Sequence, residues 1–229
     1  MKREFFRNEY KYYISTPAAR LLDSRLSAVF RKDPYAMPDG SYQILSLYFD
    51  DLNSSSFFEK IAGVQDREKF RIRLYNSDLS FLQLEKKEKI GSKIRKTGER
   101  ILLPEAERII RGDYAFLFEK DGPLFFEFAD KMRSERLKPR LFVQYKRTAY
   151  LYSAENVRIT LDEEIKGAPF RSSLLPGKVP MVPVLRQGVS VLEVKFNSFL
   201  PPMVRDLLSD IPAENTAISK FCLIAEALF

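Results

Sequence analysis

The sequence predicts an α+β fold in which about eight antiparallel strands close into a barrel and helices pack on its outside. Eight segments alternate polar and apolar residues or are rich in β-branched and aromatic residues, a pattern typical of strands. Most of the helical stretches between them begin at proline, which is favoured in the first turn of a helix. With 229 residues, of which 45% are hydrophobic, the chain can bury one substantial core, so we expect a single domain over residues 1–229.

The predicted elements follow one another along the whole chain. The strands are expected at residues 5–14, 43–50, 67–75, 81–90, 93–103, 140–152, 157–165 and 189–197. Helices are expected at residues 17–30, 104–111, 123–137 and 201–209, and from Ser219, whose hydroxyl is a suitable N-cap. The proline-rich stretch from Gly167 to Pro183 is expected to be a long loop, too short to separate two domains.

Charge and residue usage narrow the chemistry. The chain has 38 Lys plus Arg against 31 Asp plus Glu, a formal net charge of +7 that favours a polyanionic partner. It contains no histidine and a single cysteine, Cys222, which excludes Ser-His and Cys-His nucleophilic pairs and metal sites built on histidine or on several cysteines. A metal would therefore be held by oxygen ligands.

Targeting and nucleotide-binding motifs are not evident. The first residues contain no continuous apolar segment, and no stretch approaches the roughly 18 apolar residues of a membrane span, so we expect a soluble, unprocessed chain. A single cysteine fits a reducing compartment, and we expect a cytoplasmic protein. Neither a P-loop nor a Gly-x-Gly-x-x-Gly run occurs, so a nucleotide would have to be held by side chains.

Basic residues recur on one face of several predicted strands. Alternation in the segment 67–75 gathers on one face Arg67, Lys69, Arg71, Arg73 and Tyr75. Other strands gather Arg7, Glu9, Lys11 and Tyr13; Gln83, Glu85, Lys87 and Lys89; Arg158, Thr160, Asp162 and Glu164; and Glu193 with Lys195. Arg147 does not fit the division of each strand into one basic and one apolar face, because it shares its face with Leu141, Val143 and Tyr145.

These faces have two interpretations. Any single strand of this kind is adequately explained by one face on the core and one face in water. Over five or six strands, however, like charges on neighbouring strands would repel one another unless an anion compensates them. We therefore interpret the basic faces as the lining of the barrel, where converging cations would hold a row of phosphates.

Short motifs carry a resemblance over nearly the whole chain. They are RNEYK at 7–11, YFDD at 48–51, RIR at 71–73, LEKKEK at 84–89, YKRTAY at 145–150, VRITLD at 157–162, LEVK at 192–195 and SKF at 219–221. Their order and spacing resemble the polyphosphate polymerase (VTC) domain family, within the triphosphate tunnel or CYTH-like superfamily. The resemblance implies a barrel whose basic tunnel binds triphosphate.

The resemblance also implies a set of site residues. The phosphate ligands would be Lys11, Arg71, Arg73, Lys87, Lys96, Arg147, Arg158 and Lys220. Among them, the residues acting directly on the transferred phosphoryl group would be Arg71, Arg73, Lys87, Arg147 and Arg158. Glu193 would hold a divalent metal, Mn²⁺ or Mg²⁺, with Glu85 and Asp162 as secondary candidates or as salt-bridge partners of the basic side chains.

Two positions leave alternatives. The wider superfamily opens with Glu-x-Glu-x-Lys, whereas Arg7 stands at the first Glu position here, so a metal site using that position is in doubt. In the KIRK segment, Lys96 matches the family spacing from Lys87, but alternation from Lys93 favours Arg95 as the residue that faces the tunnel.

The resemblance implies a polymerase that moves the γ-phosphoryl group of ATP onto a growing inorganic polyphosphate chain, with any membrane protein that receives the product left open. A hydrolase of tripolyphosphate or nucleoside triphosphates would use the same tunnel. A non-catalytic polyanion-binding module is the third alternative. Nucleic acid is the less favoured polyanion, because the basic residues are spaced along strands with Glu between them and no RNA-binding aromatic signature occurs.

Overall fold

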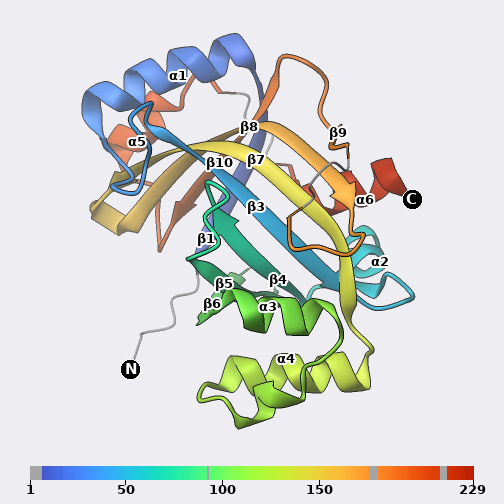
Figure 1. Ribbon diagram of the computed structural model, residues 1–229. Helices are drawn as coiled ribbons and strands as arrows, with labels where there is room; N and C mark the ends of the chain where they lie inside the picture. Colours follow the sequence, from blue (N-terminus) through green and yellow to red (C-terminus); the bar gives the residue numbers. More distant parts are fainter. Residues whose placement is uncertain (1–6, 92, 176–179, 212–215) are drawn as a thin grey trace.

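The computed structural model describes residues 7–91, 93–175, 180–211 and 216–229. Its centre is a curled antiparallel sheet with helices around it (Figure 1). Across the sheet the strand order is β1-β10-β8-β7-β3-β4-β5-β6, while β2 pairs with β7 and β9 pairs with β8. This arrangement confirms the predicted α+β fold with about eight main antiparallel strands.

The elements have the following bounds. The strands are β1 Asn8–Ser15, β2 Arg31–Lys32, β3 Ser41–Asp50, β4 Arg67–Tyr75, β5 Leu82–Ile90, β6 Lys93–Ile101, β7 Lys138–Tyr152, β8 Val157–Pro169, β9 Val182–Pro183 and β10 Val189–Phe196. The α-helices are α1 Thr16–Val29, α2 Ser55–Ile61, α3 Leu103–Ile110, α4 Pro123–Ser134, α5 Pro202–Leu207 and α6 Lys220–Leu228. Two short 3₁₀ helices are η1 Ala115–Glu119 and η2 Ala154–Asn156.

The outer face of the sheet is apolar and is covered by helices. On β3, β4 and β5, side chains such as Phe49 and Phe70 pack against Phe128 of α4 in a core that also includes residues of α3 and η1. On β8 and β10, Leu161 and other apolar residues pack against α1 and α5. Because side chains alternate along a strand, the opposite face of the same strands is left for the polar residues.

The two edges of the sheet approach each other. The backbone N–H of Arg7 donates to the carbonyl of Ile94 at 3.4 Å, which makes an antiparallel bridge between the start of β1 and strand β6. The curl therefore has an inside and an outside, with its two edge strands in contact at a bridge. Within the described residues, no helix is long and apolar enough to cross a membrane.

Helix α6 lies against the inner face of the sheet, whereas α1, α3, α4 and α5 pack on its outer face. Phe221, Ile224 and Ala225 of α6 belong to one buried cluster with Leu141 and Val143 of β7. These apolar residues of β7 are the same ones that interrupt the basic pattern before Arg147. The interruption therefore marks the place where the inside of the curl is filled by a helix.

The predicted loop from Gly167 to Pro183 was partly wrong. Strand β8 continues to Pro169, because the backbone stays paired with β7 from Ala168 opposite Phe142 to Pro169 opposite Leu141. Strand β9 then pairs with β8 at Val182 and Pro183. Residues 176–179 of the predicted loop lie outside the described part of the chain.

Gly167 is required for the close approach of α6. A Cβ at this position would lie 2.3 Å from Cγ2 of Ile224 and 2.7 Å from the carbonyl oxygen of Phe142. We expect Gly167→Ala to destabilise the fold by about 1–3 kcal/mol through overpacking, lowering the melting temperature by about 2–4 °C per kcal/mol. Gly98→Ala is the matched control, because its Cβ would meet nothing closer than 3.6 Å. Equal melting temperatures for the two variants would contradict the packing of α6 described here.

Candidate functional site

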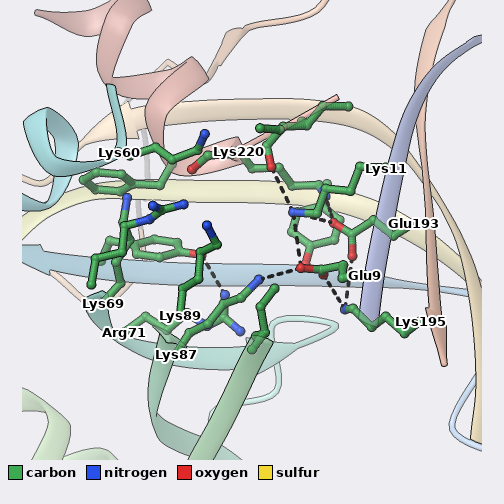
Figure 2. A pocket seen from close by; sticks show the side chains of 18 of the residues that line it. Glu9, Lys11, Lys60, Lys69, Arg71, Lys87, Lys89, Glu193, Lys195 and Lys220 are labelled. Atoms are coloured by element: carbon green, nitrogen blue, oxygen red, sulfur yellow. Dashed lines mark hydrogen bonds and ion pairs between the residues drawn. The ribbon is translucent and has the colours of Figure 1, made fainter. Parts of the chain in front are cut away.

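The inside of the curl holds a strongly basic cavity of about 340 Å³ (Figure 2). Eleven lysines and arginines of the described part of the chain line it: Lys11, Lys60, Arg67, Lys69, Arg71, Arg73, Lys87, Lys89, Arg147, Lys195 and Lys220. The acidic residues of the lining are Glu9 and Glu193. Such an excess of positive charge on concave walls attracts polyanions.

The structure brings most of the sequence-predicted ligands together. The predicted phosphate ligands in the lining are Lys11, Arg71, Arg73, Lys87, Arg147 and Lys220, and the predicted metal ligand Glu193 is there as well. Lys96 and Arg158 are not part of the lining. The residues come from β1, β4, β5, β7, β10 and α6, so they meet only because the sheet curls.

Glu9 and Glu193 are held among lysines. Glu9 lies 3.2 Å from Lys87 Nζ and 3.2 Å from Lys195 Nζ, and Glu193 lies 2.8 Å from Lys220 Nζ and 3.2 Å from Lys195 Nζ. Burial alone would raise the pKa of Glu193, but the lysines around it and Arg147 hold that pKa well below its usual range. Lys87, Lys11 and Lys195 likewise overcome the burial of Glu9 and lower its pKa. Both carboxylates are therefore ionised.

Glu85, which is not part of the cavity lining, helps to orient Arg71 and Arg73 of β4. Arg71 donates from Nε to Glu85 at 2.8 Å and from Nη1 to the Tyr48 hydroxyl at 2.6 Å. Arg73 donates from Nε to the Ser46 hydroxyl at 3.1 Å, and its Nη1 lies 3.7 Å from Glu85. Because β4 pairs with both β3 and β5, these partners stand beside the arginines in register. The guanidinium groups are thus fixed before any ligand arrives.

The open choice in the KIRK segment is decided by register. Lys96 is opposite Lys87 in the β5–β6 ladder, and its Nζ lies 2.5 Å from Glu85. Arg95 is opposite Glu88 and makes two hydrogen bonds to it at 2.7 and 3.0 Å. Lys96 therefore faces the inside of the sheet, where Glu85 lies between it and the arginines of the cavity lining, while Arg95 belongs to the outer face.

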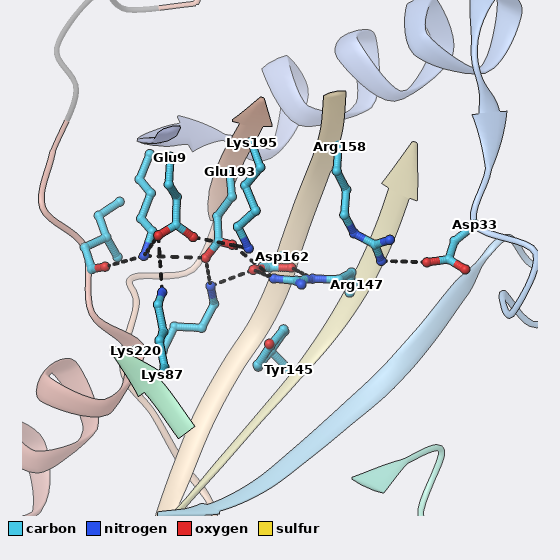
Figure 3. Close-up of polar contacts among 12 residues, drawn as sticks. Glu9, Asp33, Lys87, Tyr145, Arg147, Arg158, Asp162, Glu193, Lys195 and Lys220 are labelled. Carbon is cyan, nitrogen blue, oxygen red and sulfur yellow. Dashed lines mark hydrogen bonds and ion pairs between the residues drawn. The ribbon is translucent and has the colours of Figure 1, made fainter. Parts of the chain in front are cut away.

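A buried layer of ion pairs crosses the inside of the sheet at one wall of the cavity, where Arg147, Glu193 and Lys220 belong to the lining (Figure 3). Arg147 of β7 holds Asp162 of β8 with two hydrogen bonds of 2.6 and 2.7 Å, and Lys220 Nζ lies 2.6 Å from the same carboxylate. Arg158 lies on the far side of this layer, where its Nη2 donates to Asp33 at 2.6 Å and to the Tyr42 hydroxyl at 2.8 Å. Asp162 and Glu85 both occupy the salt-bridge role that was one of their two predicted alternatives.

Five basic residues of the described lining were not predicted as ligands: Lys60, Arg67, Lys69, Lys89 and Lys195. Lys60 comes from α2, a helix that was not predicted, although Asp50 and Asp51 of the YFDD motif cap its first turn by accepting from Ser56 N at 3.0 Å and Ser55 N at 2.8 Å. Arg67, Lys69 and Lys89 were assigned to the basic strand faces but not to the site. Alternation placed these three residues on the same strand faces as Arg71, Arg73 and Lys87, which the resemblance then selected as ligands.

The carboxylates of the cavity suit a metal that binds together with phosphate. Among the described residues, no three Asp, Glu or Cys side chains gather into a ready-made cage. Glu9 and Glu193 nevertheless present two ionised carboxylates in the lining, and Mg²⁺ is commonly held by one or two carboxylates plus phosphate oxygens. The donor set fits a divalent ion whose remaining ligands are supplied by the substrate.

Comparison with known families agrees with this geometry. A model described as the VTC domain matches residues 6–229. The chain belongs to the VTC domain family. The resemblance to the VTC domain family seen in the motifs is thereby confirmed.

Solved structures similar to this VTC domain share its fold. A putative adenylyl cyclase from Hippeastrum, described as having a dominant triphosphatase activity, is 16% identical with a TM-score of 0.57, covering 98% of this chain and 97% of its own. A putative adenylate cyclase from Bacillus halodurans is 14% identical with a TM-score of 0.54, covering 93% and 95%. The protein PH1012 from Pyrococcus horikoshii OT3 is 12% identical with a TM-score of 0.51, covering 95% and 99%. No curated protein matches the sequence of the chain.

Proposed function

We propose that this VTC domain is a metal-dependent polyphosphate polymerase that transfers the γ-phosphoryl group of ATP to inorganic polyphosphate held in the cavity. The observation that carries the proposal is the convergence of eleven cationic side chains and two ionised glutamates on one cavity inside the sheet. Phosphoryl transfer depends largely on positioning and charge neutralisation, so it needs no histidine, cysteine or other protein nucleophile. Because ATP is the donor, we place the reaction in the cytoplasm.

The proposed ligands are those of the lining. Arg71 and Arg73 present planar forks that match phosphate oxygens, and their hydrogen bonds to Glu85, Tyr48 and Ser46 keep them aligned. Lys11, Lys87, Arg147 and Lys220 add positive charge around the chain of phosphates. We propose Lys96 as an indirect participant, which neutralises Glu85 and so leaves the arginine forks available.

Glu9 and Glu193 would hold the divalent ion, Mn²⁺ or Mg²⁺. When bound, that ion would neutralise charge on the phosphate oxygens and on the leaving ADP. Without a ligand, the two carboxylates are neutralised by Lys11, Lys87, Lys195 and Lys220. Phosphates that attract these lysines would release the carboxylates, so substrate and metal are expected to bind cooperatively.

Hydrolysis is the second candidate, since water can replace phosphate as the acceptor in the same cavity. It is supported by the similar fold of the Hippeastrum protein, whose description reports a triphosphatase activity. Incubating the pure protein with ATP and Mn²⁺ separates the two reactions. Polyphosphate that resists DNase and RNase and is degraded by an exopolyphosphatase supports the polymerase. Orthophosphate without polymer contradicts it and supports the hydrolase.

A non-catalytic nucleic-acid-binding module is disfavoured by the position of the charge. The basic residues of the site line a concavity with Glu9 and Glu193 inside it, whereas duplex recognition relies on basic side chains that track an extended backbone. Duplex DNA should therefore bind weakly and be displaced by tripolyphosphate. Tight duplex binding that tripolyphosphate does not compete with would support the nucleic-acid module instead.

Lys87 should make triphosphate binding pH-dependent. Burial in the cavity lowers its pKa to about 7, with Lys11 and Lys195 acting in the same direction and Glu9 against it. Phosphate favours the charged ammonium, so binding takes up a proton and affinity should fall as pH rises from about 6 to about 8, by at most about tenfold per pH unit. Lys87→Arg is the control, because its guanidinium stays charged. Calorimetry at several pH values that gave parallel curves for the two proteins would contradict this role.

A further inference from the structure

We infer that Lys195 is an internal counter-cation of the metal site: without substrate its ammonium holds both Glu9 and Glu193, and a divalent ion has to displace it from the two carboxylates. Lys195 is thus a positioning residue that sets the affinity for the metal ion and links metal binding to phosphate binding. The inference rests on the proposed function in one respect, namely that Glu9 and Glu193 hold the divalent ion.

The ammonium of Lys195 contacts both carboxylates of the site. Its Nζ lies 3.2 Å from Oε1 of Glu9 and 3.2 Å from Oε2 of Glu193. The register of the sheet causes this contact, because Glu9 is opposite Lys195 in the β1–β10 ladder and Glu193 lies two residues before Lys195 on the same face of β10. Figure 3 shows the side chain of Lys195 beside both glutamates. A metal ion that binds the two carboxylates together must therefore compete with this ammonium.

Lys11 and Lys220 contact the same glutamates but have further partners. Lys11 reaches the two carboxylates only at 3.7 and 3.8 Å, and its ammonium donates to the carbonyl of Ile218 at 2.9 Å. Lys220 shares its ammonium with Asp162, at 2.6 Å. Within the described part of the chain, the ion pairs of Lys195 are those with the two glutamates. Lys195 is therefore the lysine whose charge serves this pair of carboxylates.

Burial makes the carboxylates depend on such a cation. Glu193 is 5% exposed, and the side chain of Glu9 is also 5% exposed. A buried carboxylate is costly unless it is paired, so the ion pairs of Lys195 stabilise the site while no metal is bound. A divalent ion that arrives alone must break these pairs and leave a buried ammonium without its partners. Metal binding without phosphate is therefore weakened by Lys195.

Phosphate gives the displaced ammonium a new partner. Lys195 belongs to the lining of the cavity, so its ammonium can leave the glutamates and remain beside a bound phosphate chain. The flexible four-carbon stem of lysine permits such a movement. With phosphate present, the loss of the two ion pairs is offset, and the carboxylates are available to the metal ion. The same exchange makes metal binding favour phosphate binding, because coupling between two ligands is reciprocal.

The test measures the affinity for Mn²⁺ alone by calorimetry, with the unmodified protein, Lys195→Met and Lys69→Met. Lys195→Met removes the competing charge, so Mn²⁺ affinity should rise by about tenfold or more. Lys69 is the matched control: it lines the cavity, but in the described chain no carboxylate lies within salt-bridge distance of it. Figure 2 shows Lys69 on the opposite side of the cavity from Lys195. Lys69→Met should raise Mn²⁺ affinity by less than about threefold.

Preloading with tripolyphosphate gives a second readout. In the unmodified protein, tripolyphosphate should increase Mn²⁺ affinity, partly because it draws Lys195 away from the glutamates. In Lys195→Met this increase should be smaller, by about the factor that the variant gains without tripolyphosphate. A lysine that only bound phosphate would leave Mn²⁺ affinity without tripolyphosphate unchanged.

Two further variants separate the charge of Lys195 from its hydrogen bonds. Lys195→Gln can still donate to the glutamates but is neutral, so it should raise Mn²⁺ affinity as methionine does, whereas Lys195→Arg keeps the charge and should not. Melting temperatures show which variants are folded. Mn²⁺ affinity that does not rise in the folded neutral variants, or that rises equally in Lys69→Met, would overturn the inference.

A failure of the proposed metal site gives a different result. If Mn²⁺ does not bind the unmodified protein even with tripolyphosphate, or if Glu9→Gln and Glu193→Gln leave its affinity unchanged, the two glutamates do not hold the metal and the inference falls with the site. If Mn²⁺ binding depends on the glutamates but not on Lys195, the metal site stands and the inference alone is wrong.

Discussion

Replacing Arg71 and Arg73 together by alanine is expected to remove nearly all affinity for triphosphate. Each guanidinium lines the cavity and is held in place by neutral hydroxyls and by Glu85, with free donors left for phosphate. A hydrogen bond to a charged group contributes about 1.5–3 kcal/mol, so the loss of two such groups should lower affinity by about 10²- to 10⁴-fold. Calorimetry with tripolyphosphate, without metal, measures the effect directly.

The control must separate loss of a ligand from loss of charge and from loss of folding. Arg95→Ala removes one positive charge from the outer face, where Arg95 is bound to Glu88, and should leave affinity unchanged. The double alanine variant also leaves Glu85 buried with Lys96 as its remaining partner, which destabilises the fold. Adding Glu85→Gln to the double variant removes the carboxylate charge that has lost Arg71 and Arg73 as partners. Full triphosphate affinity in a folded double variant would contradict the tunnel site.

The sheet could be predicted because alternation is a local property. Strand β4 has the predicted bounds, Arg67–Tyr75, since each basic side chain of the segment is followed by an apolar or outward-facing one. Helix α2 was missed because it has seven residues, and its first turn is capped by aspartates that precede it in the sequence. Helix α6 was predicted at the right place but on the wrong side of the sheet, because an apolar helix face does not say which apolar surface it meets.

From the sequence, the site could be predicted only as a set of strand faces that carry basic residues. Arg158 and Lys195 stand opposite each other in the β8–β10 ladder and share the inner face, yet only Lys195 lines the cavity. The difference depends on the ion-pair layer at Arg147 and Asp162, which is made by residues from several strands and one helix. Alternation along one strand carries no information about where such a layer lies.

The pairing of carboxylates with cations explains how so basic an interior is stable without a ligand. Burial of an unpaired charge is costly, and here each deep cation has a carboxylate within 4 Å: Glu9 serves Lys87, Glu85 serves Arg71, and Asp162 serves Arg147. Among the described residues, the lining cations without a carboxylate within 4 Å are Lys60, Arg67, Lys69 and Lys89. The same carboxylates then determine at which cations a bound phosphate has to replace an existing partner and at which cations it does not.

Glu193→Gln is expected to lower metal-dependent turnover by several orders of magnitude while leaving binding of polyphosphate without metal intact. Glutamine has nearly the same size as glutamate and still accepts hydrogen bonds from Lys220 and Lys195, whose Nζ atoms lie 2.8 and 3.2 Å from Glu193. It lacks the negative charge that a hard divalent cation requires, so Mn²⁺ or Mg²⁺ should bind more weakly. Polyphosphate affinity without metal should stay equal or rise, because a repulsive carboxylate has left the cavity.

Glu88→Gln is the matched control for this charge change. Glu88 is a buried carboxylate bound to Arg95 and Lys86, but it lies on the outer face of β5, so its replacement should not affect metal binding or turnover beyond any loss of stability. Metal affinity is measured by calorimetry in the presence of a non-hydrolysable triphosphate, and turnover is followed by release of product from ATP.

The two measurements on Glu193→Gln decide between an anchoring and a metal-holding role. If Glu193 only positioned Lys220 and Arg147, the change would weaken binding of polyphosphate without metal, and saturating substrate would restore the rate. If Glu193 holds the metal, binding without metal persists and no concentration of substrate restores the rate. A near-normal rate in Glu193→Gln would assign the metal to another carboxylate, with Glu9 the candidate in the lining, ahead of Glu85, whose partners Arg71 and Lys96 keep it behind the cavity wall.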